Sequence, residues 1–125
     1  MSKTKFREER IEKINKLYQY EVGIILNNDD EIITDIISKL DDIDEIISSS
    51  LINYTIDRLS LYDKSIIRYS IYEMKYLNTP IPIAINEAIE ITKIYTDLDE
   101  ERQHKFTNRL LDNIKDKLWA KIKYI

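Results

Sequence analysis

The chain has 125 residues, a formal net charge of −4, one glycine, two prolines and no cysteine. A chain of this length suits one domain that buries a hydrophobic core without disulfides. The absence of cysteine excludes disulfide bonds and thiolate metal sites, and it fits a reducing compartment. No apolar run approaches the roughly 18 to 20 residues that cross a membrane, and residues 1–10 lack the apolar segment of a secretory signal. We therefore expect a single cytoplasmic domain over residues 1–125 that makes no contact with a membrane.

Charge is unevenly distributed along the chain, and its distribution is more informative than the net value. Residues 3–16 contain six basic side chains against three acidic ones. Residues 29–63 contain ten acidic side chains, and residues 115–123 are basic again. Solvated helix faces would explain this pattern, and so would cationic binding surfaces near the two ends of the chain.

The first half of the chain has the periodicity of three helices. The first predicted helix covers residues 4–26, and the polar break at residues 27–30 ends it and caps the next. Helices over residues 30–40 and 41–54 follow, each with a stripe of isoleucine and leucine. The face of the first helix that we expect to be buried carries Ile11, Ile14, Leu17, Tyr18 and Val22.

The second half predicts three further helices. Ser60 is a candidate N-cap, with Asp63 in a capping-box position, and the helix over residues 62–76 is apolar almost all round, which is typical of a central buried helix. A turn with two prolines precedes a helix over residues 82–95, and Pro82 suits its start because a missing N–H costs nothing there. The last helix runs from about residue 100 to beyond residue 119.

The sequence offers little for catalysis. His104 is the only histidine, and a single glycine leaves no phosphate-binding loop of the usual kind. Glu87 and Glu90 share a helix face at i, i+3, but with no histidine nearby in sequence we interpret them as ordinary helix acids. We therefore expect no enzymatic activity, no cofactor and no metal site.

The stretch from residue 56 to residue 114 contains a series of short motifs, of which the most specific is the heptad AINEAIE at residues 84–90. This stretch resembles the core of the NusB family, and the basic N-terminus with Leu17-Tyr18 resembles the start of that family. The further matching pieces are Asp63-Lys64, Ile67-Arg68, Ile71-Tyr72-Glu73, Lys105-Phe106, Asn108 and Leu111-Asp112.

The resemblance implies an all-α fold of about seven helices packed as two small bundles. It also implies a bacterial transcription antitermination factor that binds boxA-type single-stranded RNA of ribosomal leaders. The implied partners are NusE, a ribosomal protein, and the antitermination complex on RNA polymerase. Single-stranded RNA is bound by cations for phosphates and by flat groups for bases, and the candidates here are Lys3, Lys5, Arg7, Arg10, His104, Lys105 and Phe106. The family positions implicated in the NusE contact are Tyr18 and Asp63.

Structural roles compete with these functional ones. Phe106 lies on the inward stripe of the last helix, His104 suits a surface position near a helix start, Tyr18 suits the core boundary, and Asp63 suits a cap. The family's run of consecutive arginines is also thinned here and interrupted by Glu8-Glu9. The alternative function is therefore a NusB-like protein–protein scaffold that has lost RNA binding. Kinship with the NusB-like domain of ribosomal RNA cytosine methyltransferases is disfavoured, because 125 residues leave no room for the catalytic domain.

Overall fold

The structure, a computed structural model, describes residues 3–24, 30–96 and 102–123, with side chains described from residue 5 to residue 118 of these ranges. The described residues form helices and no strand, which confirms the all-α class. They contain six α-helices and one short 3-10 helix, so the expected number of about seven is slightly too high if α-helices alone are counted. The grouping of the helices into two small bundles stays a prediction. The elements are α1 (Lys3–Glu21), α2 (Glu31–Ser38), α3 (Leu40–Ser50), η1 (Ile56–Arg58), α4 (Leu61–Tyr76), α5 (Ile81–Tyr95) and α6 (Arg102–Lys123).

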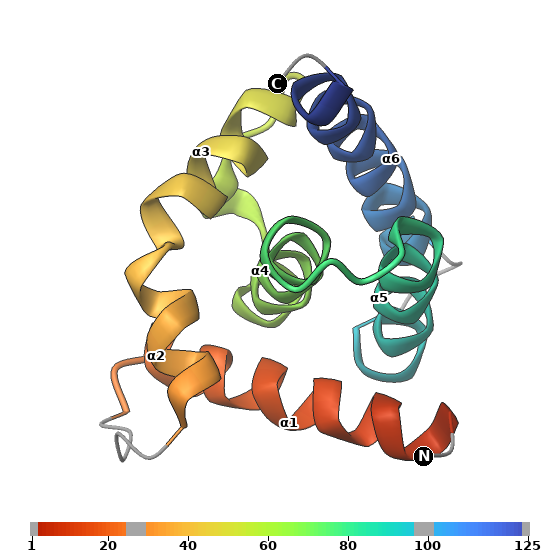
Figure 1. Cartoon of the computed structure of the whole chain (residues 1–125). Helices are drawn as coiled ribbons and strands as arrows, with labels where there is room; N and C mark the ends of the chain where they lie inside the picture. The colour runs from red at the N-terminus through yellow and green to blue at the C-terminus, as the bar shows by residue number, and fades with distance from the viewer. Residues whose placement is uncertain (1–2, 25–29, 97–101, 124–125) are drawn as a thin grey trace.

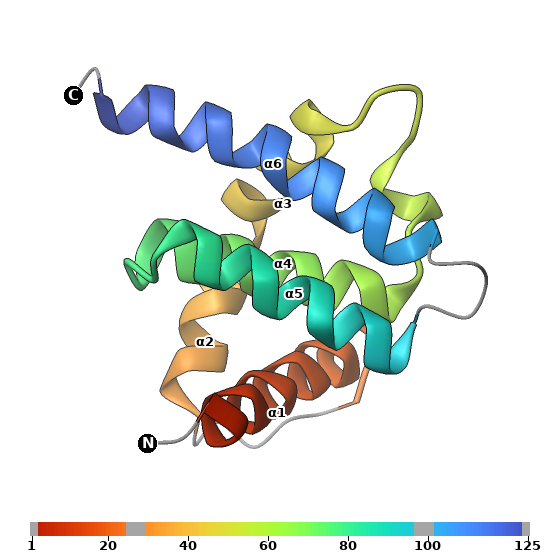
Figure 2. The same ribbon diagram turned by 90° about the vertical axis from the view of Figure 1, so that its right-hand side faces the viewer.

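Helix α4 lies at the centre, and the other helices surround it (Figure 1). Every residue of α4 from 63 to 74 is buried, as the apolar pattern of this segment predicted. Helices α5 and α6 run side by side in opposite directions (Figure 2). Helix α1 crosses below α4 and α5 in the view of Figure 2. The isoleucine and leucine stripes of the outer helices meet α4 in one continuous hydrophobic cluster.

The start of α4 confirms the predicted cap. The Ser60 hydroxyl oxygen accepts a hydrogen bond from the backbone N–H of Asp63 at 3.1 Å. The same hydroxyl donates to Asp63 Oδ2 at 2.6 Å. The Asp63 carboxylate therefore bonds the capping side chain, where a standard capping box would bond the backbone of the cap residue.

Two predicted helices end several residues earlier than expected, one before a left-handed glycine and the other at an extended leucine. Helix α1 ends at Glu21, because Gly23 adopts φ +88°, which only glycine adopts without strain. Helix α3 ends at Ser50, since Leu51 is extended and Asn53 has φ 55°. Tyr54, predicted to end that helix, lies in the connection to η1 instead.

Helix α4 also carries buried charge, which the outer helices neutralise. Lys64 donates to Glu21 at 2.7 Å. Arg68 donates to Glu21 at 3.0 Å and to both carboxylate oxygens of Asp44 at 2.7 and 2.9 Å. These bonds join α4 to the end of α1 on one side and to α3 on the other.

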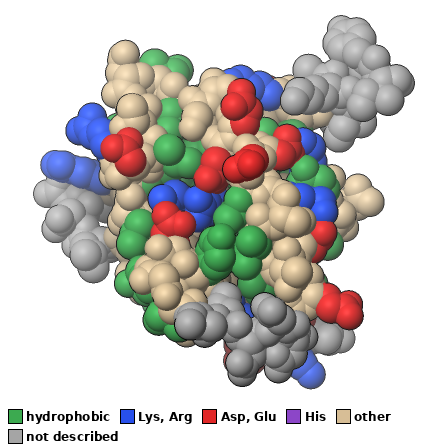
Figure 3. All heavy atoms as spheres, turned by 90° about the vertical axis from the view of Figure 1, so that its left-hand side faces the viewer, with side chains coloured by type: hydrophobic (Ala, Val, Ile, Leu, Met, Phe, Trp, Pro, Cys, Tyr) green, Lys and Arg blue, Asp and Glu red, His purple; other side chains and the backbone are tan. Residues whose placement is uncertain are grey.

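The acidic middle of the chain does not form a uniformly acidic surface. On the face that carries α2 and α3, acidic side chains lie beside basic ones (Figure 3). Asp35 accepts hydrogen bonds from Lys39 and from the Tyr72 hydroxyl, and Asp42 pairs with Lys75 at 2.5 Å. Much of the acidity of this segment is thus used in packing α2 and α3 on α4.

Within the described residues, no helix combines the length and apolar character that crossing a bilayer requires. The same part of the chain contains no group of three or more histidine, cysteine or acidic side chains placed to hold a metal ion.

Candidate functional site

The arginines expected to bind RNA lie near the start of α1, and both are held by buried acids. Arg7 donates from Nε to Glu87 Oε2 at 2.7 Å and from Nη2 to Oε1 at 3.1 Å. Arg10 donates from Nε to both oxygens of Glu73 at 3.0 Å. The side chain of Arg7 remains 26% exposed and that of Arg10 only 13% exposed. Both arginines therefore anchor α1 on α4 and α5, and Arg7 retains more contact with solvent.

Burial and pairing act on the two members of the Arg10–Glu73 pair in different ways. Burial raises the pKa of Glu73, although the hydrogen bond and the charge of Arg10 oppose that rise. Burial alone would lower the pKa of Arg10, but its hydrogen bond to Glu73 raises it. The hydrogen bond to Glu87 likewise raises the pKa of Arg7. Both guanidinium groups are therefore charged at neutral pH.

The lysines of α1 have separate positions. Lys5 is exposed, whereas the side chain of Lys3 lies outside the described residues. Lys13 and Lys16 donate to Asp30 Oδ2 at 2.6 and 2.8 Å. Although burial opposes it, these hydrogen bonds hold the pKa of Asp30 well below its usual range. Because Asp30 also caps α2, two of the basic residues of α1 serve to attach α2.

The second group of expected RNA-binding residues lies in the first turns of α6. Lys105 is exposed, and His104 and Phe106 are half-buried. The ring of Phe106 packs against that of Tyr54 with centroids 5.4 Å apart. The guanidinium of Arg58 lies over the other ring of this pair, 4.7 Å from the Tyr54 centroid. Phe106 is thus part of an aromatic and cationic stack at the edge of the core.

Sequence reasoning missed Tyr54 and Arg58, because periodicity assigned Tyr54 to a helix. The structure places both next to Phe106, and the Tyr54 hydroxyl donates to the backbone oxygen of Arg58 at 3.0 Å. The only sequence signal was the spacing of four residues between Tyr54 and Arg58. That spacing predicts two neighbours on one helix face, whereas Tyr54 lies in a loop.

The structure does not bring the two groups of RNA-binding candidates together. The start of α1 lies against the middle of α5 through the Arg7–Glu87 pair, whereas α6 begins beyond the far end of α5 (Figure 2). Tyr95 at the end of α5 is eight residues beyond Glu87, which corresponds to about 12 Å along the helix axis. One extended RNA strand would have to run along this part of the surface to contact both groups.

Tyr18, expected to contact a protein partner, belongs to a row of three tyrosines from three helices. The Tyr62 ring on α4 lies between Tyr18 on α1 and Tyr95 on α5, with centroids 5.6 Å apart in both pairs. Tyr18 is 36% exposed and Tyr95 48% exposed. Tyr62 is more buried, donates to Asn15 Oδ1 at 2.7 Å, and has its pKa raised to about 12 by burial.

This tyrosine row was not foreseen beyond Tyr18, because no local pattern connects residues 18, 62 and 95. Two further exposed apolar side chains lie near this row in sequence. Val22 directly follows the end of α1, and Leu61 is the first residue of α4. Apolar bodies with polar tips, exposed on neighbouring helices, are typical of protein-binding surfaces.

Asp63, the other expected partner contact, lies beneath the surface. It is 5% exposed, and its Oδ1 atom is buried with no hydrogen-bond partner in the described residues. Its demonstrated contact is the cap at Ser60. A partner would reach this carboxylate only after the side chain or its surroundings moved.

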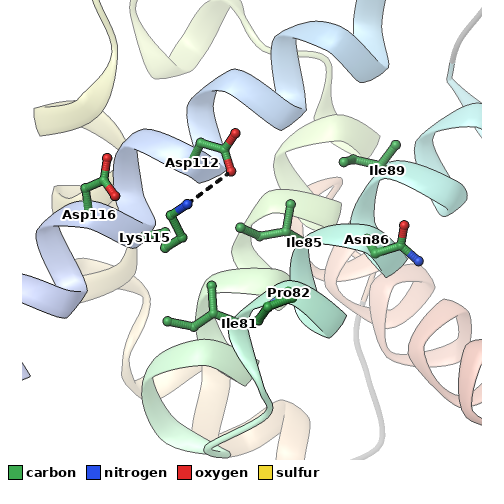
Figure 4. A pocket seen from close by; sticks show the side chains of 8 residues that line it. All are labelled: Ile81, Pro82, Ile85, Asn86, Ile89, Asp112, Lys115 and Asp116. Carbon is green, nitrogen blue, oxygen red and sulfur yellow. Dashed lines mark ion pairs between the residues drawn. The ribbon is translucent and has the colours of Figure 1, made fainter.

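A hollow of about 520 Å³ lies between α5 and α6 (Figure 4). Its floor is apolar, and the α6 side carries charged groups, of which Lys115 pairs with Asp112 at 3.8 Å. Two carboxylates against one lysine leave this hollow with a small net negative charge, which disfavours an anion. The lining residues are Ile81, Pro82, Ile85, Asn86, Ile89, Asp112, Lys115 and Asp116.

These features define a small all-helical protein built around one buried helix, with a charged end on α1 and an aromatic row across three helices. The profile of the NusB family matches residues 5–116. The chain belongs to the NusB family.

Individual relatives agree with this assignment. The solved structure of NusB from T. maritima superposes with a TM-score of 0.73 at 30% identity, covering 89% of this chain and 90% of that one. The transcription antitermination protein NusB of Bacillus pumilus is 37% identical over 90 residues, which cover 71% of this chain and 66% of the relative. The corresponding protein of Listeria monocytogenes is 50% identical over 74 residues, or 58% of this chain and 56% of the relative. The matches thus span 56 to 66% of the length of these curated relatives.

Proposed function

We propose that this protein is a cytoplasmic transcription antitermination factor, a single domain over residues 1–125 that binds boxA-type single-stranded RNA together with NusE. It would act within the antitermination complex on RNA polymerase. Membership of the NusB family supports this function, since the matching relatives are named transcription antitermination proteins.

On the RNA side, the observation that carries the proposal is the exposure of Lys5 and Lys105 at the two separate candidate sites. Lys5, with the outward part of Arg7, would contact phosphates near α1. Lys105 would do so near α6, with Phe106 beside it as a flat group. On the protein side, the tyrosine row around Tyr18 would contact NusE. The other residues assigned to RNA, namely Lys3, Arg10 and His104, remain part of the proposal.

The scaffold that has lost RNA binding is the second candidate function, and one observation favours it. Arg7 and Arg10 are both engaged by buried glutamates, which reduces the cationic surface that α1 offers to phosphates. Such a scaffold would retain the tyrosine row and bind NusE alone.

Fluorescence anisotropy with a labelled boxA-type RNA separates the two functions. The RNA is titrated at two salt concentrations, with and without NusE, against a scrambled RNA. An RNA-binding factor should prefer the boxA sequence, bind more tightly with NusE, and lose affinity with salt by a log–log slope of about 0.7 per phosphate neutralised. Binding of NusE without RNA binding under any condition would support the scaffold and contradict the RNA-binding function.

A further inference from the structure

A second hollow, of about 640 Å³, lies between the start of α1 and the turn that leads from α4 into α5. Its walls are mostly apolar, and its size lies within the roughly 300–1,000 Å³ of typical small-molecule sites. The Phe6 side chain is 47% exposed here, although phenylalanine is normally buried. The residues that form the walls are Phe6, Thr79, Pro80, Pro82, Ile83 and Asn86.

Charged groups at this hollow are already neutralised. Arg10 and Glu87 also line it, and each is paired, Arg10 with Glu73 and Glu87 with Arg7. The hollow therefore presents an aromatic ring, apolar walls and the exposed amide of Asn86 more than a net charge. An amide both donates and accepts hydrogen bonds, as the edge of a nucleobase does.

The surroundings favour RNA over other occupants. Phe6 and Arg10 are four residues apart and share a face of α1, and Lys5 and Arg7 flank the ring in sequence. Single-stranded RNA is recognised by this combination, in which cations hold phosphates while unstacked bases stack on aromatic rings. Phe106 cannot supply the ring at this place, because it packs on Tyr54 at the start of α6.

We propose that this hollow is a nucleobase site, in which one base of a bound RNA strand stacks on Phe6 and bonds through its edge to Asn86. The proposal rests on the RNA-binding function proposed above and assigns to it a residue outside both expected groups. Lys5 and the outward part of Arg7 would hold the phosphates next to the inserted base.

The test compares Phe6→Ala and Phe6→Tyr with Tyr20→Ala, a matched control that removes another exposed ring from the same helix, 41% exposed. RNA affinity is measured by anisotropy with the boxA-type RNA used above. Loss of a stacking ring should weaken binding by roughly 5- to 150-fold in Phe6→Ala. Phe6→Tyr, which keeps the ring, and Tyr20→Ala should both bind RNA like the unmodified protein.

A second readout reports stacking directly. RNAs that carry 2-aminopurine at successive positions are titrated with the protein, and one position should show fluorescence quenching that Phe6→Ala abolishes and Phe6→Tyr retains. Circular dichroism and a thermal melt check that all three variants fold. Because Phe6 is half exposed, we expect its removal to leave the helical signal unchanged.

The possible results distinguish the nucleobase site from the RNA-binding function on which it rests. Absence of RNA binding by the unmodified protein would overturn both the proposed function and the nucleobase site. Salt-dependent RNA binding that Phe6→Ala leaves intact would overturn the nucleobase site alone. Weakened NusE binding in Phe6→Ala with RNA affinity preserved would show that the hollow receives a protein segment and would also overturn it.

Discussion

Glu87 on α5 holds the guanidinium of Arg7 on α1 through two hydrogen bonds of 2.7 and 3.1 Å, across eighty positions of sequence. The bidentate geometry fixes both the position and the rotation of the arginine. One of the residues that sequence reasoning assigned to RNA is therefore also a structural contact between the first helix and the AINEAIE heptad.

Separating this pair should destabilise the fold. We expect Arg7→Gln and Glu87→Gln each to lower the free energy of unfolding by about 1–3 kcal/mol, since each leaves a charge in a mostly buried site. The double variant should lose less than the sum of the two single losses, because neither charge then remains. Urea denaturation of the four proteins measures this coupling. Strictly additive losses would show that the two side chains do not stabilise each other.

Asp30 should make stability depend on pH. Its pKa is well below the ordinary value in the folded protein, so its contribution is fully present above the unfolded pKa of about 4 and is lost as the pH falls from there through the folded pKa. Asp30→Asn isolates the charge, since asparagine caps helices equally well. We expect this variant to be less stable by about 1–2 kcal/mol at pH 7, a figure reduced for the partial exposure of Lys13 and Lys16.

The corresponding measurement is urea denaturation of both proteins at pH 7, 5 and 3.5. The difference between them should be constant at the two higher values and smaller at pH 3.5. Other carboxylates titrate in both proteins and cancel in the difference. A difference that does not change with pH would contradict the role of the Asp30 charge.

Lys105 should contribute one phosphate contact. Lys105→Gln is expected to weaken RNA binding and to reduce the salt slope of log affinity by about 0.7, the value for one contact on a single strand. Lys93→Gln is a suitable control, because Lys93 is exposed on α5 and pairs with Glu90 at 3.4 Å. Anisotropy titrations over a series of salt concentrations give both slopes. Equal slopes for the two variants would remove Lys105 from the RNA-binding surface.

Tyr18 should act on the protein partner and not on RNA. We expect Tyr18→Ala to weaken NusE binding by roughly 5- to 30-fold, as removal of an interface tyrosine commonly costs about 1–2 kcal/mol. RNA affinity in the absence of NusE should not change. Tyr20→Ala serves as the control, because residues two apart on a helix point to different faces. Isothermal titration with NusE measures the effect, and equal affinities of the two variants would exclude the tyrosine row as the docking surface.

The parts of the structure that follow local rules could be predicted from the sequence. The cap at Ser60, the central position of α4 and the proline start of α5 each depend on residues within a few positions of one another. Family resemblance added the class of fold. The end of α3 escaped prediction, because the apolar periodicity continues to Tyr54 while the backbone is already extended at Leu51.

The candidate site was less predictable, because charge pairing between helices depends on tertiary packing. Six basic residues near the start of the chain suggested a cationic surface, but four of them, Arg7, Arg10, Lys13 and Lys16, form ion pairs with acids on other segments. Periodicity shows which face of a helix is buried and does not show which side chain it meets. Phe6 was overlooked for a different reason. The sequence shows Phe6 between the cations Lys5 and Arg7. The exposure of the Phe6 ring, however, depends on the position of the turn between α4 and α5.

The charged residues at the two ends of α4 also decide how α1 can lie across it. Lys64 and Arg68 near the start of α4 meet Glu21 at the end of α1, and Glu73 near the end of α4 meets Arg10 near the start of α1. If α1 ran in the reverse direction, Arg10 would approach Lys64 and Arg68, and Glu21 would approach Glu73. Both encounters would place like charges together in a poorly solvated interface, so the reversed topology is disfavoured more strongly than hydrophobic packing alone would achieve.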